Sequence, residues 1–149
     1  DIIEVSAIKY DVGFKPISCF TTLTKPKKPI PPEASRVNNI TDNMVANAPS
    51  FSEIAIAFSE YISDCNIVGH NVMFDLKFLF ASGAKLPPKA RYYDTLDLAR
   101  KTLNGLVYDY RLDTLCGYFN IVRNEAHRSS SDCLATAKLF EMIVKFKTI

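Results

Sequence analysis

Paired cysteines are missing from this sequence. Its four cysteines are widely scattered, and no two of them form a C-x-x-C pair. Neither a zinc knuckle nor a thiol redox motif is therefore indicated. We expect reduced thiols rather than a disulfide framework at Cys19, Cys65, Cys116 and Cys133.

Long apolar runs are missing as well. No stretch approaches the ~18 consecutive apolar residues that cross a bilayer. The first residues also lack the basic-then-apolar order of a signal peptide. We therefore expect a cytoplasmic protein.

The sequence has no large excess of one charge. It carries 18 Lys and Arg residues against 16 Asp and Glu residues, a formal net charge of +2. This is not the basic footprint of a protein that grips a long duplex. It does not exclude an enzyme that holds a few nucleotides through metal ions, because the ions supply positive charge locally. The lysines of the proline-rich segment 25–32 can form a solvated loop or contact nucleic acid, and both interpretations stay open.

The length and composition are those of a globular protein. At 149 residues it is about one domain long, and 48% of its residues are hydrophobic. We find no internal repeat and no low-complexity segment, so residues 1–149 are expected to form a single domain. Asp1 stands directly before a strand-like run, and we expect this domain to be incomplete at its N-terminus.

Residue periodicity predicts strands that alternate with helices after an initial hairpin. Segments 2–8 and 17–23 suit the hairpin, and 25–32 suits an extended connection because closely spaced prolines disfavour helix. A capping box at Ser50–Glu53 predicts a helix to about residue 62. Ile67–Val68 reads as a buried strand, followed by a helix over 72–80, a short strand at 92–93, and helices over 94–103, 112–119 and 132–146. This order predicts an α/β fold with a mixed sheet.

The first chemical feature is the segment Gly69–Asp75, where the predicted buried strand gives way to a helix. Asp75 lies three and four residues before Phe78 and Leu79, so its carboxylate shares a helix face with apolar residues. An acid there is costly unless a cation meets it. Ligands of α/β folds bind just past the carboxyl ends of strands, which makes a metal ion one answer. A helix cap is the alternative.

The second feature lies at the start of the last helix. Asp132 stands three residues before Ala135 on the apolar stripe of that helix, so it also points inward. His127 precedes it on a loop, and an imidazole suits a general base at neutral pH. The sequence has only two histidines, and the other, His70, falls in the first segment. His70 is open to a structural role beside Asn71.

These residues resemble the motifs of a known family. Gly69-His70-Asn71-x-x-Phe74-Asp75 is similar to the second motif of the DEDDh 3′→5′ exonuclease superfamily, and His127-x-x-x-x-Asp132 is similar to its third. Segments 2–8, 40–51 and 94–100 resemble further stretches of that family in the same order. The resemblance is strongest to bacterial proofreading exonucleases, the DNA polymerase III epsilon-subunit and PolC-type group.

The resemblance implies a ribonuclease H-like fold and a two-metal hydrolysis of phosphodiester bonds. Asp75 and Asp132 would hold two divalent cations, Mg²⁺ or Mn²⁺, and His127 would act as general base. His70, Asn71 and Phe74 would contact the substrate. The implied substrate is the single-stranded 3′ end of DNA, or RNA, cleaved to nucleoside monophosphates during proofreading in DNA replication. A DNA polymerase subunit is the implied partner.

Two departures from the family accompany this resemblance. The first motif, Asp-x-Glu in a strand, is absent, and Asp1 and Glu4 have the wrong spacing to replace it. We expect the remaining metal ligands upstream of Asp1, and an unpaired sheet edge beside residues 3–8. Without the remaining metal ligands, this chain should be inactive or impaired. The second departure is Asn38–Asn39, where many relatives carry His-Gly.

Two other function classes stay open from the sequence. One is a non-catalytic homologue or fragment that acts as an adaptor for nucleic acid or a polymerase. The other is an α/β domain whose acids are only helix caps.

Overall fold

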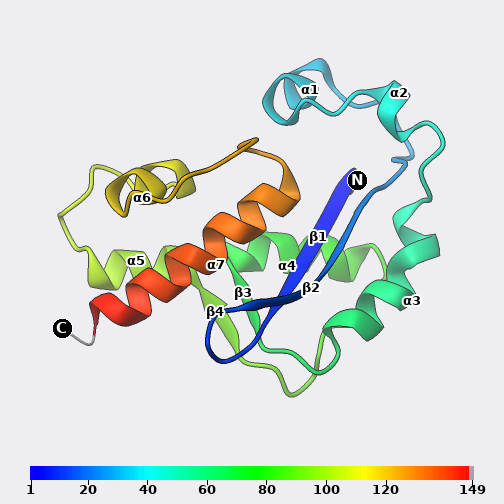
Figure 1. The fold of residues 1–149 in the computed structure, drawn as a ribbon. Coiled ribbons are helices and arrows are strands. Elements are labelled where there is room, and N and C mark those ends of the chain that lie inside the picture. The colour runs from blue at the N-terminus through cyan, green and yellow to red at the C-terminus, as the bar shows by residue number, and fades with distance from the viewer. Residues whose placement is uncertain (148–149) are drawn as a thin grey trace.

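The computed structural model describes residues 1–147 and has the expected α/β architecture (Figure 1). Its strands are β1 (Glu4–Tyr10), β2 (Pro16–Leu23), β3 (Ile67–Gly69) and β4 (Tyr92–Asp94). Its helices are α1 (Pro32–Asn38), α2 (Asp42–Val45), α3 (Phe51–Ile62), α4 (Val72–Ala81), α5 (Thr95–Thr102), α6 (Leu112–Tyr118) and α7 (Ser129–Phe146).

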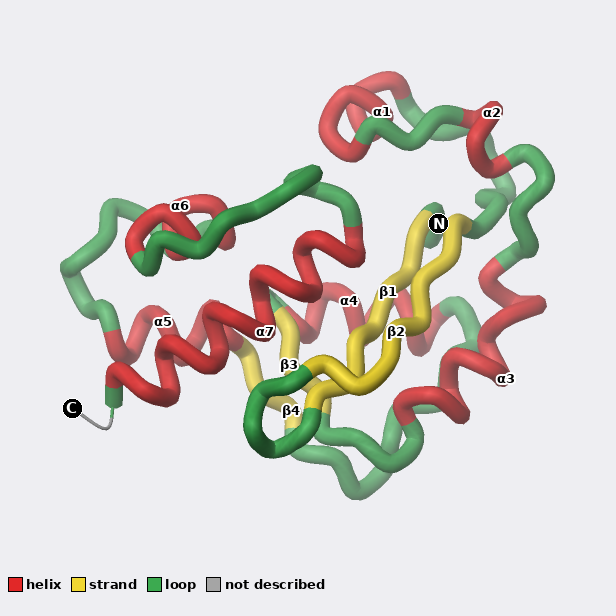
Figure 2. Tube along the Cα trace, viewed as in Figure 1, coloured by secondary structure: helices red, strands yellow, loops and turns green. Residues whose placement is uncertain are grey.

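The strands pair in both directions, but they form two small sheets rather than one mixed sheet. β1 and β2 pair antiparallel, with Glu4 opposite Leu23, and β3 and β4 pair parallel, with Ile67 opposite Tyr92. Figure 2 shows the two pairs in yellow. Within residues 1–147, β1 therefore has one unpaired edge, and so does β3.

This division changes the environment of β3. The apolar run Ile67–Val68 predicts a buried strand, but Val68 is 37% exposed and its two neighbours in β3 are only half-buried. The prediction of full burial was wrong because β3 has a partner strand on one side alone. Burial on both faces and both edges is the property of a strand inside a larger parallel sheet.

The helices begin where local chemistry favours them. Ser50 and Glu53 form the predicted capping box, with the Ser50 amide donating to Glu53 Oε2 at 2.6 Å. Helix α1 was not predicted, because the proline run indicated an extended chain through Pro32. Pro32 instead opens α1. Proline is tolerated at the first helical position, where its missing N–H has no partner to lose.

Three hydrophobic clusters hold the described elements together, and the smallest joins Ile30, Ile40 and Val45 beside α1 and α2. The first joins Val5 of β1 to the buried face of α3, and the second joins α5, α6 and α7. Leu139 and Ile143 of α7 lie in the second cluster with almost no exposed surface. Because α7 also packs against both β1 and β3, it is the element that both sheets share (Figure 1).

The turn from β3 into α4 leaves no room for a side chain at Gly69. A Cβ placed there would lie 2.7 Å from Cγ2 of Val72, the first residue of α4. Glycine therefore allows the helix to start directly against the end of the strand. Among residues 1–147, no helix is long and apolar enough to cross a membrane.

Candidate active site

Asp75 lies in the first turn of α4, just beyond the carboxyl end of β3. Its side chain keeps contact with solvent, but protein packed around the carboxylate raises its pKa to about 6, and the nearby charges of Asp94 and Asp132 add to the shift. Asp94 and Asp132 therefore lie close enough to Asp75 to act on it electrostatically. The sequence placed Asp75 and Asp132 in one region, and this coupling is consistent with that expectation.

Asp94 was not singled out from the sequence, yet it organises this region. Its Oδ1 accepts hydrogen bonds from the amides of Asn71 and Leu96, both at 2.9 Å, and its Oδ2 accepts one from Val72 at 3.1 Å. One carboxylate thus caps the N-termini of α4 and α5 together. The signal that could have found it is the Asp94–Thr95 pair at the start of a predicted helix.

His70 has both ring nitrogens engaged by the protein. Nδ1 lies 2.9 Å from Oγ1 of Thr95, and Nε2 lies 3.0 Å from the carbonyl oxygen of Tyr110. Burial lowers the pKa of His70 and so favours the neutral ring. These contacts tie the end of β3 to α5 and to the segment before α6, which favours the structural interpretation of His70.

Asn71 and Phe74 stand on the open side of the same turn. Asn71 occupies the N-cap position of α4 in the left-handed conformation, with φ of 57°, and its side chain makes no capping hydrogen bond. The Phe74 side chain is 59% exposed, and its ring lies 5.0 Å from that of Phe78, centroid to centroid. An exposed ring one residue from Asp75 is available for stacking on a nucleobase.

Asp132 lies in the first turn of α7, which begins three residues earlier than predicted. Its Oδ1 accepts a hydrogen bond from Nη2 of Arg123 and another, at 3.2 Å, from the backbone amide of His127. Nη1 of Arg123 donates to Oδ1 of Asp113 at the start of α6. The guanidinium therefore bridges two carboxylates from two helices.

His127 lies on the segment between α6 and α7, as expected, in a left-handed conformation with φ of 67°. Its side chain is half exposed, and Nε2 lies 3.9 Å from Oδ2 of Asp113. The structure therefore brings His127 beside Asp132 through the backbone, with its ring directed toward Asp113.

Glu4, which the sequence excluded as a metal ligand, has a structural role. Its carboxylate accepts hydrogen bonds from Nε and Nη2 of Arg128 and from the amide of Ser129. Burial opposes ionisation of Glu4, but these partners hold its pKa below the ordinary value. The start of α7 is thereby fastened to β1. No signal in the sequence predicts this pair, because its two residues lie more than 120 positions apart.

Asp75 and Asp132 offer carboxylate oxygens as ligands for a divalent cation. Carboxylate oxygens suit Mg²⁺ and Mn²⁺, so the chemistry of Asp75 and Asp132 fits. The number does not suffice for two ions, because residues 1–147 contain no group of three or more candidate ligands. These two side chains can contribute to a cation site, but further carboxylates are needed to complete one.

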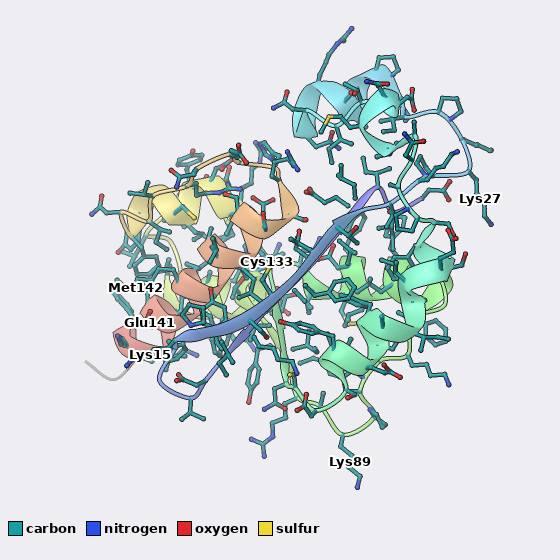
Figure 3. All side chains as sticks on the ribbon, turned by 45° about the vertical axis from the view of Figure 1, so that its right-hand side comes forward. Lys15, Lys27, Lys89, Cys133, Glu141 and Met142 are labelled. Atoms are coloured by element: carbon teal, nitrogen blue, oxygen red, sulfur yellow. The ribbon has the colours of Figure 1, made fainter. Side chains whose placement is uncertain are left out.

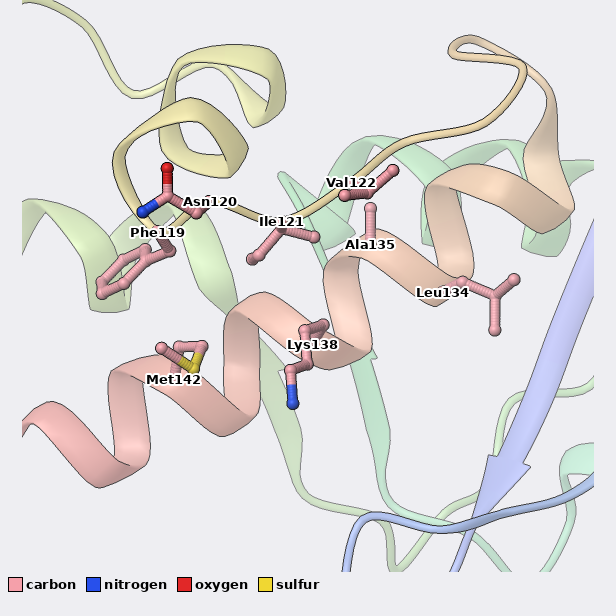
Figure 4. Close-up of a pocket in the computed structure, with 8 residues that line it drawn as sticks. All are labelled: Phe119, Asn120, Ile121, Val122, Leu134, Ala135, Lys138 and Met142. Carbon is pink, nitrogen blue, oxygen red and sulfur yellow. The ribbon is translucent and has the colours of Figure 1, made fainter.

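Two surface depressions border this region. One of about 600 Å³ is lined by His70, Asn71, Arg100, Tyr108 and residues 109–112. The other, of about 340 Å³, lies along α7, and Leu134, Lys138 and Met142 line it with segment 119–122 (Figure 4). Lys27 of the proline-rich segment projects from the periphery of the molecule (Figure 3) and lines neither depression.

Comparison with known proteins assigns the class. The sequence model of the RNase T exonuclease family matches residues 1–140. The chain therefore belongs to this exonuclease family, a class of hydrolases. Its fold also matches solved exonucleases, among them "Exonuclease X in complex with 5′ overhanging duplex DNA", with a TM-score of 0.79, 23% identity and coverage of 99% of this chain and 85% of that one. For E. coli exonuclease I with a dA16 oligonucleotide the TM-score is 0.82, at 19% identity, over 98% and 37% of the two chains.

Within the family, the sequence is similar to replicative enzymes of bacteria. It is 36% identical to the DNA polymerase III subunit epsilon of Treponema pallidum, over 96% of this chain and 68% of that protein. It is 32% identical to the PolC-type DNA polymerase III of Caldanaerobacter subterraneus, over 100% of this chain but 11% of that protein. The predicted family and its epsilon and PolC relatives are thus confirmed.

Proposed function

We propose that the protein containing this chain is a 3′→5′ exonuclease that removes nucleoside monophosphates from DNA ends, in the manner of a proofreading enzyme. The observation that carries the proposal is the convergence of two motifs distant in sequence. α4 and α7 bring Asp75 and Asp132 close enough for the charge of Asp132 to raise the pKa of Asp75, within a fold of the exonuclease family.

The residues divide the work by position. Asp75 and Asp132 would hold the divalent cations, and His127 would accept the proton of the attacking water. When bound, such cations stabilise negative charge on the scissile phosphate. His70 positions the turn from β3 to α4, because its own nitrogens are satisfied. Asn71 and Phe74 would contact the terminal nucleotide.

We place the missing carboxylates on a strand between β1 and β3. Each of these strands has an unpaired edge within residues 1–147, and α7 packs against both. An added strand would pair with the backbone groups at these edges. A strand that carries Asp-x-Glu would bring the carboxylate count to four, enough for two cations.

Alanine substitutions in the full-length protein test the assignment. We expect Asp75→Ala and Asp132→Ala to abolish Mg²⁺- or Mn²⁺-dependent exonuclease activity. His127→Ala should lower the rate by roughly 10²–10⁴-fold and keep most of the metal binding, as expected for a general base. Asp97→Ala, on the exposed side of α5, is the control. Activity that survives all three substitutions would show that other residues do the chemistry.

A single-stranded 3′ end is the proposed substrate. The exposed ring of Phe74 supports it, because stacking recognises a frayed end without reading a groove. Two of the matched structures are exonucleases in complexes with an oligonucleotide and with overhanging duplex DNA. Single-stranded DNA should be digested faster than blunt duplex by the full-length protein. Equal rates would contradict this choice of substrate.

A polymerase is the proposed partner, from the epsilon and PolC relatives. If the full-length protein binds polymerase and DNA but hydrolyses neither single strands nor mismatched ends, the adaptor interpretation replaces the enzymatic one.

A further inference from the structure

Arg123 is the most deeply placed cation of the site region. Its side chain is 8% exposed, and its Nε is buried without a hydrogen-bond partner among the described residues. Burying a guanidinium is costly unless carboxylates meet it, and here two of them do. Asp113 comes from the start of α6 and Asp132 from the start of α7.

The segment between these helices, residues 119–128, needs such an anchor. It contains three non-glycine residues with left-handed backbone: Asn120, Glu125 and His127, with φ of 54°, 39° and 67°. Such conformations persist only where surrounding contacts fix them. Arg123 lies in the middle of this segment, and its two ion pairs fasten it to both flanking helices.

The same oxygen links Arg123 to the proposed general base. Asp132 Oδ1 accepts hydrogen bonds from Arg123 and from the backbone amide of His127. On the other side, Asp113 binds Arg123 through Oδ1 and lies 3.9 Å from the His127 ring through Oδ2. Both carboxylates that touch Arg123 therefore also border His127.

We propose that Arg123 is a positioning residue: its buried guanidinium bridges Asp113 and Asp132 and so sets both the orientation of Asp132 and the place of His127. It engages Oδ1 of Asp132 and leaves Oδ2 free of protein partners among residues 1–147. This role rests on the proposed function of Asp132 and His127. A lysine cannot reproduce it fully, because one ammonium lacks the planar fork that spans two carboxylates.

The first test is independent of activity. Hydrogen exchange of the chain is measured with Arg123→Gln, Arg123→Lys and the control Arg111→Gln, whose side chain is 85% exposed. We expect faster exchange over residues 119–132 for Arg123→Gln, a smaller increase for Arg123→Lys, and none for Arg111→Gln. Unchanged exchange in Arg123→Gln would overturn the proposal.

Asp113→Asn provides a second variant that is expected to fold, because the Asp113 side chain is 59% exposed. It cuts one arm of the bridge and keeps Asp132. The proposal requires faster exchange over 119–128 here as well. If only variants of Arg123 respond, Arg123 acts on Asp132 alone and the bridge is refuted.

The second test measures kcat, KM and Mn²⁺ affinity of the full-length protein. We expect Arg123→Gln to lower kcat on the order of 10–100-fold with KM little changed, because misplaced groups slow the chemical step. Arg123→Lys should recover part of the loss. Tighter Mn²⁺ binding by Arg123→Gln, with normal exchange over 119–132, would show a competing cation instead. A wild-type protein without Asp75-dependent activity would refute the proposed function, whereas the exchange measurements would still decide the role of Arg123.

Discussion

The role proposed for Asp75 as a metal ligand conflicts with the environment of its carboxylate. A metal ligand has to be ionised at neutral pH, but the packing around Asp75 and the charges of Asp94 and Asp132 favour its protonated form. The folded chain therefore carries an unfavourable negative charge at this position. Such a charge costs stability and makes the site receptive to a cation.

The stability of the fold should therefore depend on pH through the protonation of Asp75. Asp75 has a pKa of about 6 when folded and about 3.9 when unfolded, so the folded state binds the proton more tightly. Its contribution to stability is fully present below about pH 4 and is lost as the pH rises through about 6. We expect Asp75→Asn to raise Tm at pH 7 by about 2 °C, less than the full pKa shift implies because the side chain is exposed and solvent screens its charge, and to give no gain at pH 4.

Thermal unfolding at both pH values, with Asp97→Asn as control, measures this difference. An Asp75→Asn variant with the same Tm difference at pH 4 and pH 7 would mean that ionised Asp75 is not disfavoured in the fold.

At the scale of the elements, the site depends on where helices begin. Asp75 and Asp132 both lie in the first turn of a helix, and each start is fastened by another part of the chain. Asp94 caps α4, and Glu4 binds Arg128 and Ser129 at the start of α7. The positions of Asp75 and Asp132, the proposed metal ligands, thus depend on contacts that other residues make at the N-termini of α4 and α7.

Asp94 offers a direct test of this dependence. Asp94→Ala removes acceptors from the starts of α4 and α5, and the free energy of unfolding should fall by about 1–2 kcal/mol. Asp94→Asn keeps one acceptor oxygen, so it should lose less. Urea denaturation of both variants gives the comparison. Equal stability of Asp94→Ala and the wild type would rule out the double cap.

The sequence predicted these elements well where the signal is local. The capping box at Ser50–Glu53, the helix after Asn71 and the α5 start at Thr95 depend on neighbouring residues, and all appear in the structure. Helix α1 was missed because a proline run favours extended chain until its last member. The Arg123 bridge and the Glu4–Arg128 pair were missed because ion pairs between distant segments leave no periodic pattern in one sequence.

At the scale of the whole molecule, α7 unites the parts. One face belongs to the cluster with α5 and α6, and the helix also packs against β1 and β3. The two sheets share no hydrogen-bonded pair among residues 1–147. The relation between them therefore depends on packing: on α7, and on the cluster in which Ile67 of β3 packs with Val5 of β1.

The buried face of α7 should accordingly dominate stability. Leu139→Ala removes a side chain with no exposed surface and should lower the free energy of unfolding by about 2–5 kcal/mol. Leu134→Ala, on the same helix but 51% exposed, is the matched control and should change it by much less. Chemical denaturation distinguishes them. Similar losses for both would mean that α7 is not anchored through this face.

The proposed strand predicts a further whole-molecule difference. In the full-length protein, amides of β1 should exchange more slowly than in residues 1–149 alone, because a partner would bond the edge that is unpaired here. Amides of α3 serve as the internal reference. This helix packs against the hairpin in the first hydrophobic cluster. Identical protection of β1 in the two proteins would place the missing carboxylates elsewhere.

Gly69 has a consequence for how sequence variants of this protein would be interpreted. It has no functional group, yet any side chain there would collide with Val72 and push the start of α4, and with it Asp75, away from β3. In a saturation screen scored by activity, every substitution at Gly69 should therefore resemble the loss of a catalytic residue. A variant in which Gly69 is substituted but Asp75 and Asp132 are unchanged would then be inactive for purely geometric reasons.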